Sequence, residues 1–168
     1  GEEIGSVENL LLNDAGQVVA LVVQVGGFWD IGDTHVAVPW EDATIEGNLV
    51  HVPITEENAE DYSLFDDRFF SRTDVGDLAT VDDDLMTGPE IWKASALIDD
   101  YAVLETGEGY GYIDDLVFDA GGMLTSVVVN TSGADYGTHG YYAYPWYGYG
   151  YVDYDWDPGL DYYTLPFD

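Results

Sequence analysis

Residues 1–40 read GEEIGSVENLLLNDAGQVVALVVQVGGFWDIGDTHVAVPW, and residues 107–146 read GEGYGYIDDLVFDAGGMLTSVVVNTSGADYGTHGYYAYPW. The two segments align over forty positions without a gap. Identical pairs include Gly5/Gly111, Leu10/Leu116, Gly16/Gly122, Val22/Val128, Val23/Val129, Pro39/Pro145 and Trp40/Trp146. Self-similarity at a fixed offset is typical of a duplicated structural unit. The sequence therefore predicts that one small domain is built twice.

Each copy divides into short strands. Residues 4–12 and 17–25 are mostly apolar or alternating, and a turn ending in Gly16 separates them. A glycine supplies the positive φ that tight hairpin turns need. A looser loop and a strand ending in Pro-Trp follow, and proline limits a strand to an edge or an end. Short strands with frequent turns indicate an all-β protein. We expect two tandem small antiparallel β-barrels, with few short helices near residues 55–62 and 94–98.

The domain boundaries follow from the repeat and from composition. The first domain is predicted over residues 1–66 and the second over residues 93–168, which carries a Tyr/Gly-rich tail. An acidic linker is expected over residues 67–92.

The charge is extreme: 34 Asp and Glu face 3 Lys and Arg, for a net charge of −31. Binding to nucleic acid requires clusters of Lys and Arg, so the composition excludes it. Two interpretations stay open, a solvated surface suited to a salty environment and local binding of divalent cations. No run of 18 apolar residues occurs, so membrane insertion is not expected.

Enzymatic chemistry is not expected either. The sequence contains no G-x-S-x-G, H-E-x-x-H or G-K-[ST] motif. It also contains no Cys, which excludes disulfides and thiolate metal sites.

Two acidic segments are candidate cation sites, with Ca²⁺ or another divalent cation as the ligand. Alternate carboxylates before a glycine can converge on Ca²⁺ in a loop, a pattern seen at Asp153, Asp155, Asp157 and Asp161. The second candidate is the run Asp82, Asp83 and Asp84 in the linker. In both segments the alternative is a set of solvated carboxylates that bind no ion.

The aromatic segment 141–156 is the candidate partner site. Its Tyr147, Tyr149, Tyr151, Tyr154 and Trp156 either brace a strand or form an exposed platform for a protein partner, a glycan or another copy of the chain.

A strand is missing from the first copy. Residues 101–106 precede the second copy and are expected to pair with residues 110–118, whereas the sequence begins at the equivalent of Gly107. An unpaired edge exposes backbone hydrogen-bonding groups. Three explanations stay open: a segment upstream, another part of this chain, or strand donation by a neighbouring molecule from residues 101–106 or 162–167.

The ordered motif GEEIGSVENLLLNDAGQVVALVV…VAVPW resembles the PRC-barrel family, and the second copy resembles it more distantly. This resemblance implies a β-barrel of about six strands that acts as a non-catalytic interaction or scaffold module. Tandem copies with a Tyr/Gly-rich tail are similar to secreted or periplasmic proteins of alphaproteobacteria, which implies a periplasmic or extracellular location. The expected partner is a protein, or another copy of the chain through self-association.

Overall fold

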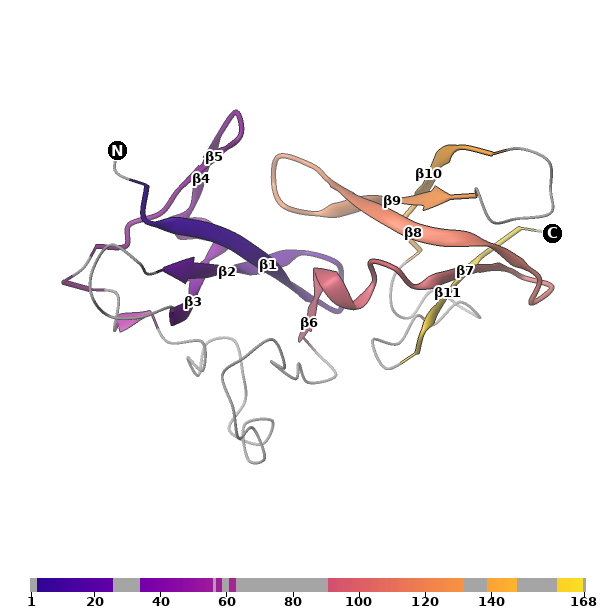
Figure 1. Cartoon of the computed structure of the whole chain (residues 1–168), viewed down its shortest axis with the longest axis horizontal. Helices are drawn as coiled ribbons and strands as arrows, with labels where there is room; N and C mark the ends of the chain where they lie inside the picture. Colours follow the sequence, from indigo (N-terminus) through magenta and orange to yellow (C-terminus); the bar gives the residue numbers. More distant parts are fainter. Residues whose placement is uncertain are drawn as a thin grey trace.

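The computed structural model describes residues 3–25, 34–55, 57–58, 61–62, 91–131, 139–147 and 160–167 (Figure 1). Its first half contains β1 (Gly5–Asn13), β2 (Val18–Val25), β3 (Thr34–Pro39), the short 3-10 helix η1 (Trp40–Asp42), β4 (Thr44–Glu46) and β5 (Leu49–His51). Its second half contains β6 (Ile91–Lys93), the 3-10 helix η3 (Ala94–Ala96), β7 (Tyr101–Leu104), β8 (Gly109–Phe118), β9 (Leu124–Asn130), β10 (Tyr141–Pro145) and β11 (Tyr162–Leu165). The all-β prediction, with few short helices, is confirmed.

The strands form two equivalent sheets that lie side by side (Figure 1). The first domain has the strand order β3-β2-β1-β6, with β4 and β5 as a separate hairpin. The second domain has the order β10-β9-β8-β7-β11, in which only β11 and β7 run parallel. Of the predicted linker, residues 67–90 lie outside the described residues, and residues 91–92 belong to β6, which pairs with β1.

Each domain uses the same turn between its first two long strands. In the first domain the Asn13 side-chain oxygen accepts hydrogen bonds from the N–H groups of Ala15 (3.1 Å) and Gln17 (3.0 Å). In the second domain, the Asp119 side-chain oxygen accepts hydrogen bonds from the N–H groups of Gly121 (2.8 Å) and Met123 (3.0 Å). The turns end in glycines with positive φ, which measures 80° at Gly16 and 82° at Gly122. A short polar side chain therefore holds each turn, and a glycine permits its left-handed backbone.

These two turns join the domains. The Val18 N–H donates to the Gly122 carbonyl and the Leu124 N–H donates to the Gly16 carbonyl, each at 2.9 Å. Two tryptophans lie over the turns in the same reciprocal way: Trp40 packs on Gly122, and Trp146 packs on Gly16. The repeat is therefore visible in three dimensions as a nearly two-fold arrangement.

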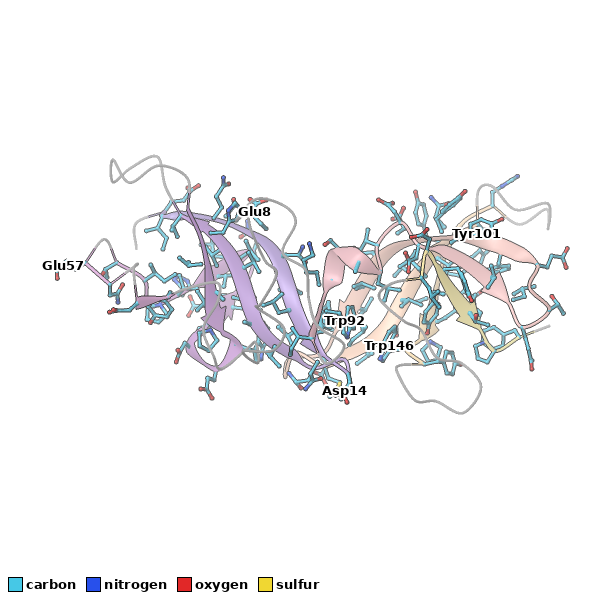
Figure 2. All side chains as sticks on the ribbon, turned by 90° about the horizontal axis from the view of Figure 1, so that it is seen from below. Glu8, Asp14, Glu57, Trp92, Tyr101 and Trp146 are labelled. Atoms are coloured by element: carbon cyan, nitrogen blue, oxygen red, sulfur yellow. The ribbon has the colours of Figure 1, made fainter. Side chains whose placement is uncertain are left out.

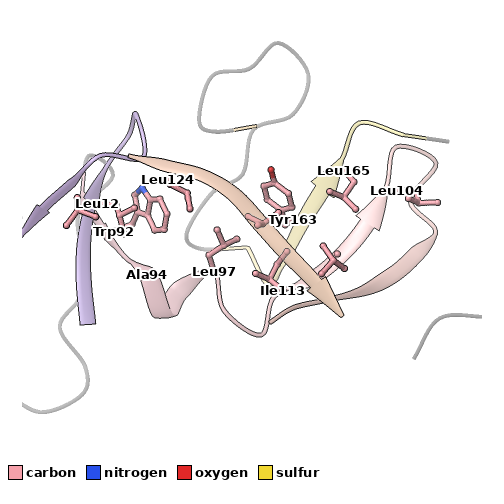
Figure 3. Close-up of a cluster of buried hydrophobic side chains, with 13 residues drawn as sticks. Leu12, Trp92, Ala94, Leu97, Leu104, Ile113, Leu124, Tyr163 and Leu165 are labelled. Atoms are coloured by element: carbon pink, nitrogen blue, oxygen red, sulfur yellow. The ribbon is translucent and has the colours of Figure 1, made fainter. Parts of the chain in front are cut away.

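One hydrophobic core continues across this junction. Leu12 and Val18 of the first domain share a buried cluster with Trp92 and with the inner residues of the second domain (Figure 3). Trp92 is buried, and its indole N–H donates to the Asn13 carbonyl at 2.9 Å. The domains are thus packed against one another and not only tethered by a linker. A smaller cluster fills the first domain: Leu21, Val23, Val25, Val36, Val38 and Ile54.

Among the described residues no helix is long and apolar enough to cross a membrane.

Candidate binding surface on the second domain

Four tyrosines and one asparagine lie in a single line across the five strands of the second domain. The strand register places Tyr141 opposite Asn130, Asn130 opposite Tyr112, Tyr112 opposite Tyr101, and Tyr101 opposite Tyr162. Paired residues of neighbouring strands share one face of a sheet. We call these five residues the tyrosine row.

The tyrosine row is on the outer face. Its four rings are 40% to 66% exposed. The residues that follow them in the strands point inward, because side chains alternate between the two faces. Three of these residues are buried, Ala102, Ile113 and Tyr163, whereas Tyr142, which follows Tyr141, is 39% exposed. The core on one face therefore fixes the tyrosines on the other, and Figure 2 shows Tyr101 at this outer surface.

Local contacts order the row. The rings of Tyr101 and Tyr112 meet edge to face with centroids 5.0 Å apart. A tight turn before β7 sets the position of Tyr101: Asp99 has a φ of 73°, and its N–H donates to the Ile113 carbonyl at 2.8 Å. The Tyr101 N–H then donates to the Asp161 carbonyl at 3.1 Å. Backbone hydrogen bonds to β8 on one side and to the residue before β11 on the other thus fix the position of Tyr101.

The surroundings of the row are acidic. Asp114 accepts a hydrogen bond of 3.5 Å from the side chain of Asn130, and the exposed Asp99 and Asp161 precede β7 and β11. Of the three basic residues, Lys93 is the one within the described part of the chain, and it lies on β6. Tyrosine rings offer apolar faces that attract cations, and their hydroxyls form hydrogen bonds. Such a surface can bind an apolar or cationic partner and repels an anionic one.

Among the described residues of the first domain, no tyrosines occupy the corresponding strand positions. The copies align at an offset of 106 residues (107 minus 1), so the corresponding line consists of Ser6, Gln24 and His35. The next positions on the outer face also differ. In the first domain they are buried: Leu11, Ala20, Val22 and Ala37. Ile91 of β6 packs against that cluster.

In the second domain the same positions are open. Val117, the counterpart of Leu11, is 42% exposed, whereas Leu11 is 0% exposed. Ala143 is exposed and Val128 is half-buried. The tyrosine row therefore continues into an uncovered apolar area whose counterpart is covered in the first domain. Exposed apolar area of this kind commonly marks an interaction site.

Two other tyrosines serve the fold. The Tyr163 hydroxyl accepts a hydrogen bond from the Tyr147 N–H at 2.9 Å, and burial raises the pKa of Tyr163 well above its ordinary value. Burial also raises the pKa of Tyr144, and the hydrogen bond between its hydroxyl and that of Tyr110 (2.6 Å) adds to the effect. Both phenols remain neutral near pH 7, and they brace the inner side of the sheet.

The predicted partner residues are placed only in part. Tyr147 is half-buried. Its backbone N–H donates to the Tyr163 hydroxyl, and its ring contacts the Phe167 ring edge to face, with centroids 6.3 Å apart. Tyr147 therefore contacts other residues of its own domain, and its role in binding a partner stays a prediction. The other four predicted partner residues lie outside the described residues: Tyr149, Tyr151, Tyr154 and Trp156.

The predicted cation sites stay a prediction. Asp161 is exposed, while the rest lie outside the described residues: Asp82, Asp83, Asp84, Asp153, Asp155 and Asp157. Within the described ranges, no three His, Asp or Glu side chains are arranged to hold a metal ion.

Sequence reasoning missed the tyrosine row itself. Tyr101, Tyr112 and Tyr162 belong to three strands, and they come together only when β7 is placed between β8 and β11. The available signal was the comparison of the copies, which shows tyrosine at positions 112 and 141 where the first copy has Ser6 and His35.

The comparisons with known proteins agree with this architecture. The family model for the PRC-barrel domain matches the chain twice, over residues 1–59 and over residues 90–158. No curated protein matches the sequence. Because the two matches cover most of the chain, and because the first contains β1 to β5 and the second contains β6 to β10, the protein belongs to the PRC-barrel family as a tandem pair of PRC-barrel domains.

Proposed function

We propose that the protein is a non-catalytic, highly acidic scaffold of the cell envelope or exterior, and that its second domain binds a partner protein through the tyrosine row. One observation carries this proposal: aromatic and apolar side chains are exposed on the second domain at positions that are polar or buried in the first. Both copies keep the residues that build the fold. The tyrosines therefore reflect a role that the fold alone does not require.

Protein is the partner class that the surface chemistry favours. Tyrosine supplies a large contact area at little conformational cost and is enriched at protein interfaces. A row of exposed rings across five strands suits an extended protein surface better than a small ligand, which needs a concave pocket. The acidic surroundings favour a partner with Lys or Arg close to its apolar contact residues.

The net charge of −31 supports a role at an exposed surface in contact with salt. We propose that counterions solvate the carboxylates and that divalent cations bind loosely among them. The location in the envelope or exterior rests on the resemblance of the repeat and its Tyr/Gly-rich tail to secreted and periplasmic proteins. Fractionation of cells that express the natural gene with an affinity tag tests it, and recovery in the cytoplasm refutes it.

Comparative affinity capture tests the binding role. Immobilised wild-type protein and a Tyr101→Ser/Tyr112→Ser variant are exposed to the same envelope extract. The control is Ile45→Ser, which removes an exposed apolar side chain from β4. We expect a specific protein that both wild type and Ile45→Ser retain and that the double variant loses. Equal capture by all three proteins contradicts the proposal.

The alternative is a structural protein that self-assembles through β-strands or aromatic surfaces. It is favoured by the exposed aromatic rings of the second domain, since Tyr141 is 66% exposed and Tyr112 is 51% exposed. Sedimentation velocity over a wide range of protein concentration tests it. A size that rises with concentration supports assembly, and a constant monomer supports the binding role.

A further inference from the structure

A carboxylate lies beside the tyrosine row on β8. Asp114 is the extra residue of a β-bulge, since the pairing of β8 with β9 shifts between Ile113 and Asp115. The side chain of Asn130, which is directly opposite Tyr112, donates a hydrogen bond of 3.5 Å to the Asp114 carboxylate. The carboxylate therefore lies on the outer face next to Tyr112, and both residues are exposed.

The first domain has the same bulge with different chemistry. The pairing of β1 with β2 shifts at the equivalent place, and Glu8 is the counterpart of Asp114. The Ser6 hydroxyl donates to the Glu8 carboxylate at 2.6 Å. Tyr112 takes the position of Ser6 in the second copy. An exposed aromatic ring and a carboxylate therefore lie where the first domain has an internal hydrogen bond.

Neighbouring strands support the Tyr112 ring. It contacts the Tyr101 ring at an interplanar angle of 61°. Gly109 makes room for Tyr101, because a Cβ at that position would overlap the Tyr101 ring and hydroxyl, and the counterpart of Gly109 in the first copy is Glu3. β8 is paired on both edges at Tyr112, with Tyr101 and with Asn130. No strand position is therefore open at this point of the described sheet.

We propose that Tyr112 and Asp114 form a site for the guanidinium group of an arginine side chain on the partner protein, an inference that rests on the binding role proposed above. A guanidinium is planar, stacks on aromatic faces and forms forked hydrogen bonds to carboxylates. Residues two apart on a strand are separated by about 6–7 Å, and a cation is attracted to a ring within about 6 Å of its centroid. One arginine can therefore contact both side chains.

Other cations suit this pair of side chains less well. A lysine ammonium is compact and strongly hydrated, so it gains less than a guanidinium from an exposed ring. Divalent cations such as Ca²⁺ take several oxygen ligands. Within the described ranges, no three His, Asp or Glu side chains are arranged to supply them.

A separate basic protein is the source of the arginine that the charges favour. Two copies of this chain carry a net charge of −31 each and repel one another, whereas the same charge attracts a basic partner. Lys93 lies on β6, in the sheet of the first domain. The two arginines of the chain, Arg68 and Arg72, lie outside the described residues. These arginines, and any segment of the same protein beyond the 168 residues, are the competing occupants.

Titration with Nα-acetyl-arginine methylamide tests the site, with the backbone amide chemical shifts followed by NMR. The lysine analogue is a control of equal charge, and the citrulline analogue is a control of similar shape without the charge. We expect saturable shifts centred on Tyr112 and Asp114, with a dissociation constant at least threefold lower than that of either control. Shifts centred on other residues contradict the assignment, and this measurement needs no variant.

Three variants then identify the contacts. Tyr112→Ser introduces the residue found at the equivalent position of the first domain and should weaken binding of the arginine probe at least threefold. Asp114→Asn should weaken it at least threefold through the lost carboxylate charge. Glu8→Gln is the matched control, because it removes the same charge from the equivalent bulge, and it should leave the affinity unchanged. Equal losses in Asp114→Asn and Glu8→Gln overturn the site.

Two further proteins separate the competing occupants. Arg68→Gln/Arg72→Gln should bind the probe with wild-type affinity, and a gain of threefold or more would assign the site to an arginine of this chain. Protein expressed from the complete natural gene should bind the probe as the 168-residue chain does. Loss of binding there would assign the site to another segment of the same protein. Either contrary result overturns the assignment to a partner.

The titration and the affinity capture fail independently. Equal affinity for the arginine and lysine probes, or no saturable binding, overturns the arginine site. A partner that is captured through the tyrosine row in that case leaves the proposed function standing. Selective binding of the arginine probe without any captured protein supports the guanidinium site and contradicts the proposed function.

Discussion

Gln17 and Met123 lie opposite each other in an antiparallel bridge that joins the two domains at equivalent turns. The Gln17 side-chain amide adds a hydrogen bond of 2.9 Å to the Gly121 carbonyl. Each domain thus uses its own hairpin turn as the contact surface for the other. These contacts predict that each domain stabilises the other.

Substitution of Gly122 tests this junction. Its φ is 82°, and an added Cβ would lie 2.7 Å from the Cε2 atom of Trp40. Gly122→Ala should lower the free energy of unfolding by about 2–4 kcal/mol, the sum of left-handed strain and steric overlap. Gly107→Ala is the matched control, because its φ is 80° and no atom lies within 4 Å of the new Cβ. The control should cost about 1–2 kcal/mol, as measured by urea unfolding. An equal loss of unfolding free energy in the two variants would show that the contact between Gly122 and Trp40 does not contribute to stability.

Because Trp92 lies in the core shared by both domains, its substitution should strongly lower the free energy of unfolding. The side chain is 1% exposed, and its indole N–H bonds to the Asn13 carbonyl. Trp92→Ala should cost about 3–5 kcal/mol through the cavity it leaves. Trp92→Phe keeps most of the apolar volume and should cost about 1–3 kcal/mol. Both values come from urea unfolding with Ile45→Ala as the control, which should change stability by less than about 0.5 kcal/mol. Separate unfolding transitions for the two domains would contradict a continuous core.

High pH should destabilise the protein. The folded state raises the pKa values of Tyr163 and Tyr144 above the ordinary value of 10.0, so it favours the neutral phenols. In the unfolded chain these two tyrosines ionise near pH 10. The stabilisation is therefore complete below about pH 10 and is lost as the pH rises through the folded pKa. Urea unfolding at a series of pH values measures the slope, which Tyr163→Phe should reduce. A slope that this substitution leaves unchanged would contradict the assignment to Tyr163.

Salt should stabilise the protein through general screening. The net charge is −31, so the carboxylates repel one another. The screening length falls from about 10 Å at 0.1 M to about 3 Å at 1 M salt. The melting temperature should rise steadily with NaCl. CaCl₂ at matched ionic strength should add a small further rise if divalent cations bind loosely among the carboxylates. A saturating rise at low Ca²⁺ would indicate a specific site, and its loss in Asp157→Asn/Asp161→Asn would place that site in the C-terminal acidic segment.

Much of the fold follows from local features of the sequence. The apolar runs of β1 and β2, the turn at Asn13–Gly16 and the Pro-Trp ending are each encoded within a few residues. The second copy repeats them, so strand positions and the duplicated architecture were predictable. The pairing of residues 101–104 with β8 was predictable for the same reason, since a short turn joins the two strands.

Contacts between distant segments could not be predicted in this way. Nothing local indicates that β11 pairs parallel to β7, or that β6 joins the sheet of the first domain. The tyrosine row depends on both the register and the strand order of a five-stranded sheet, and a shift of one residue would turn a ring inward. The exposure of Val117 likewise becomes visible only beside Leu11, its buried counterpart in the first domain. The sequence by itself determined the strands, the turns and the charge, because these depend on neighbouring residues. The tertiary structure decided which side chains meet across strands and which stay exposed, because these depend on pairings between residues far apart in the chain.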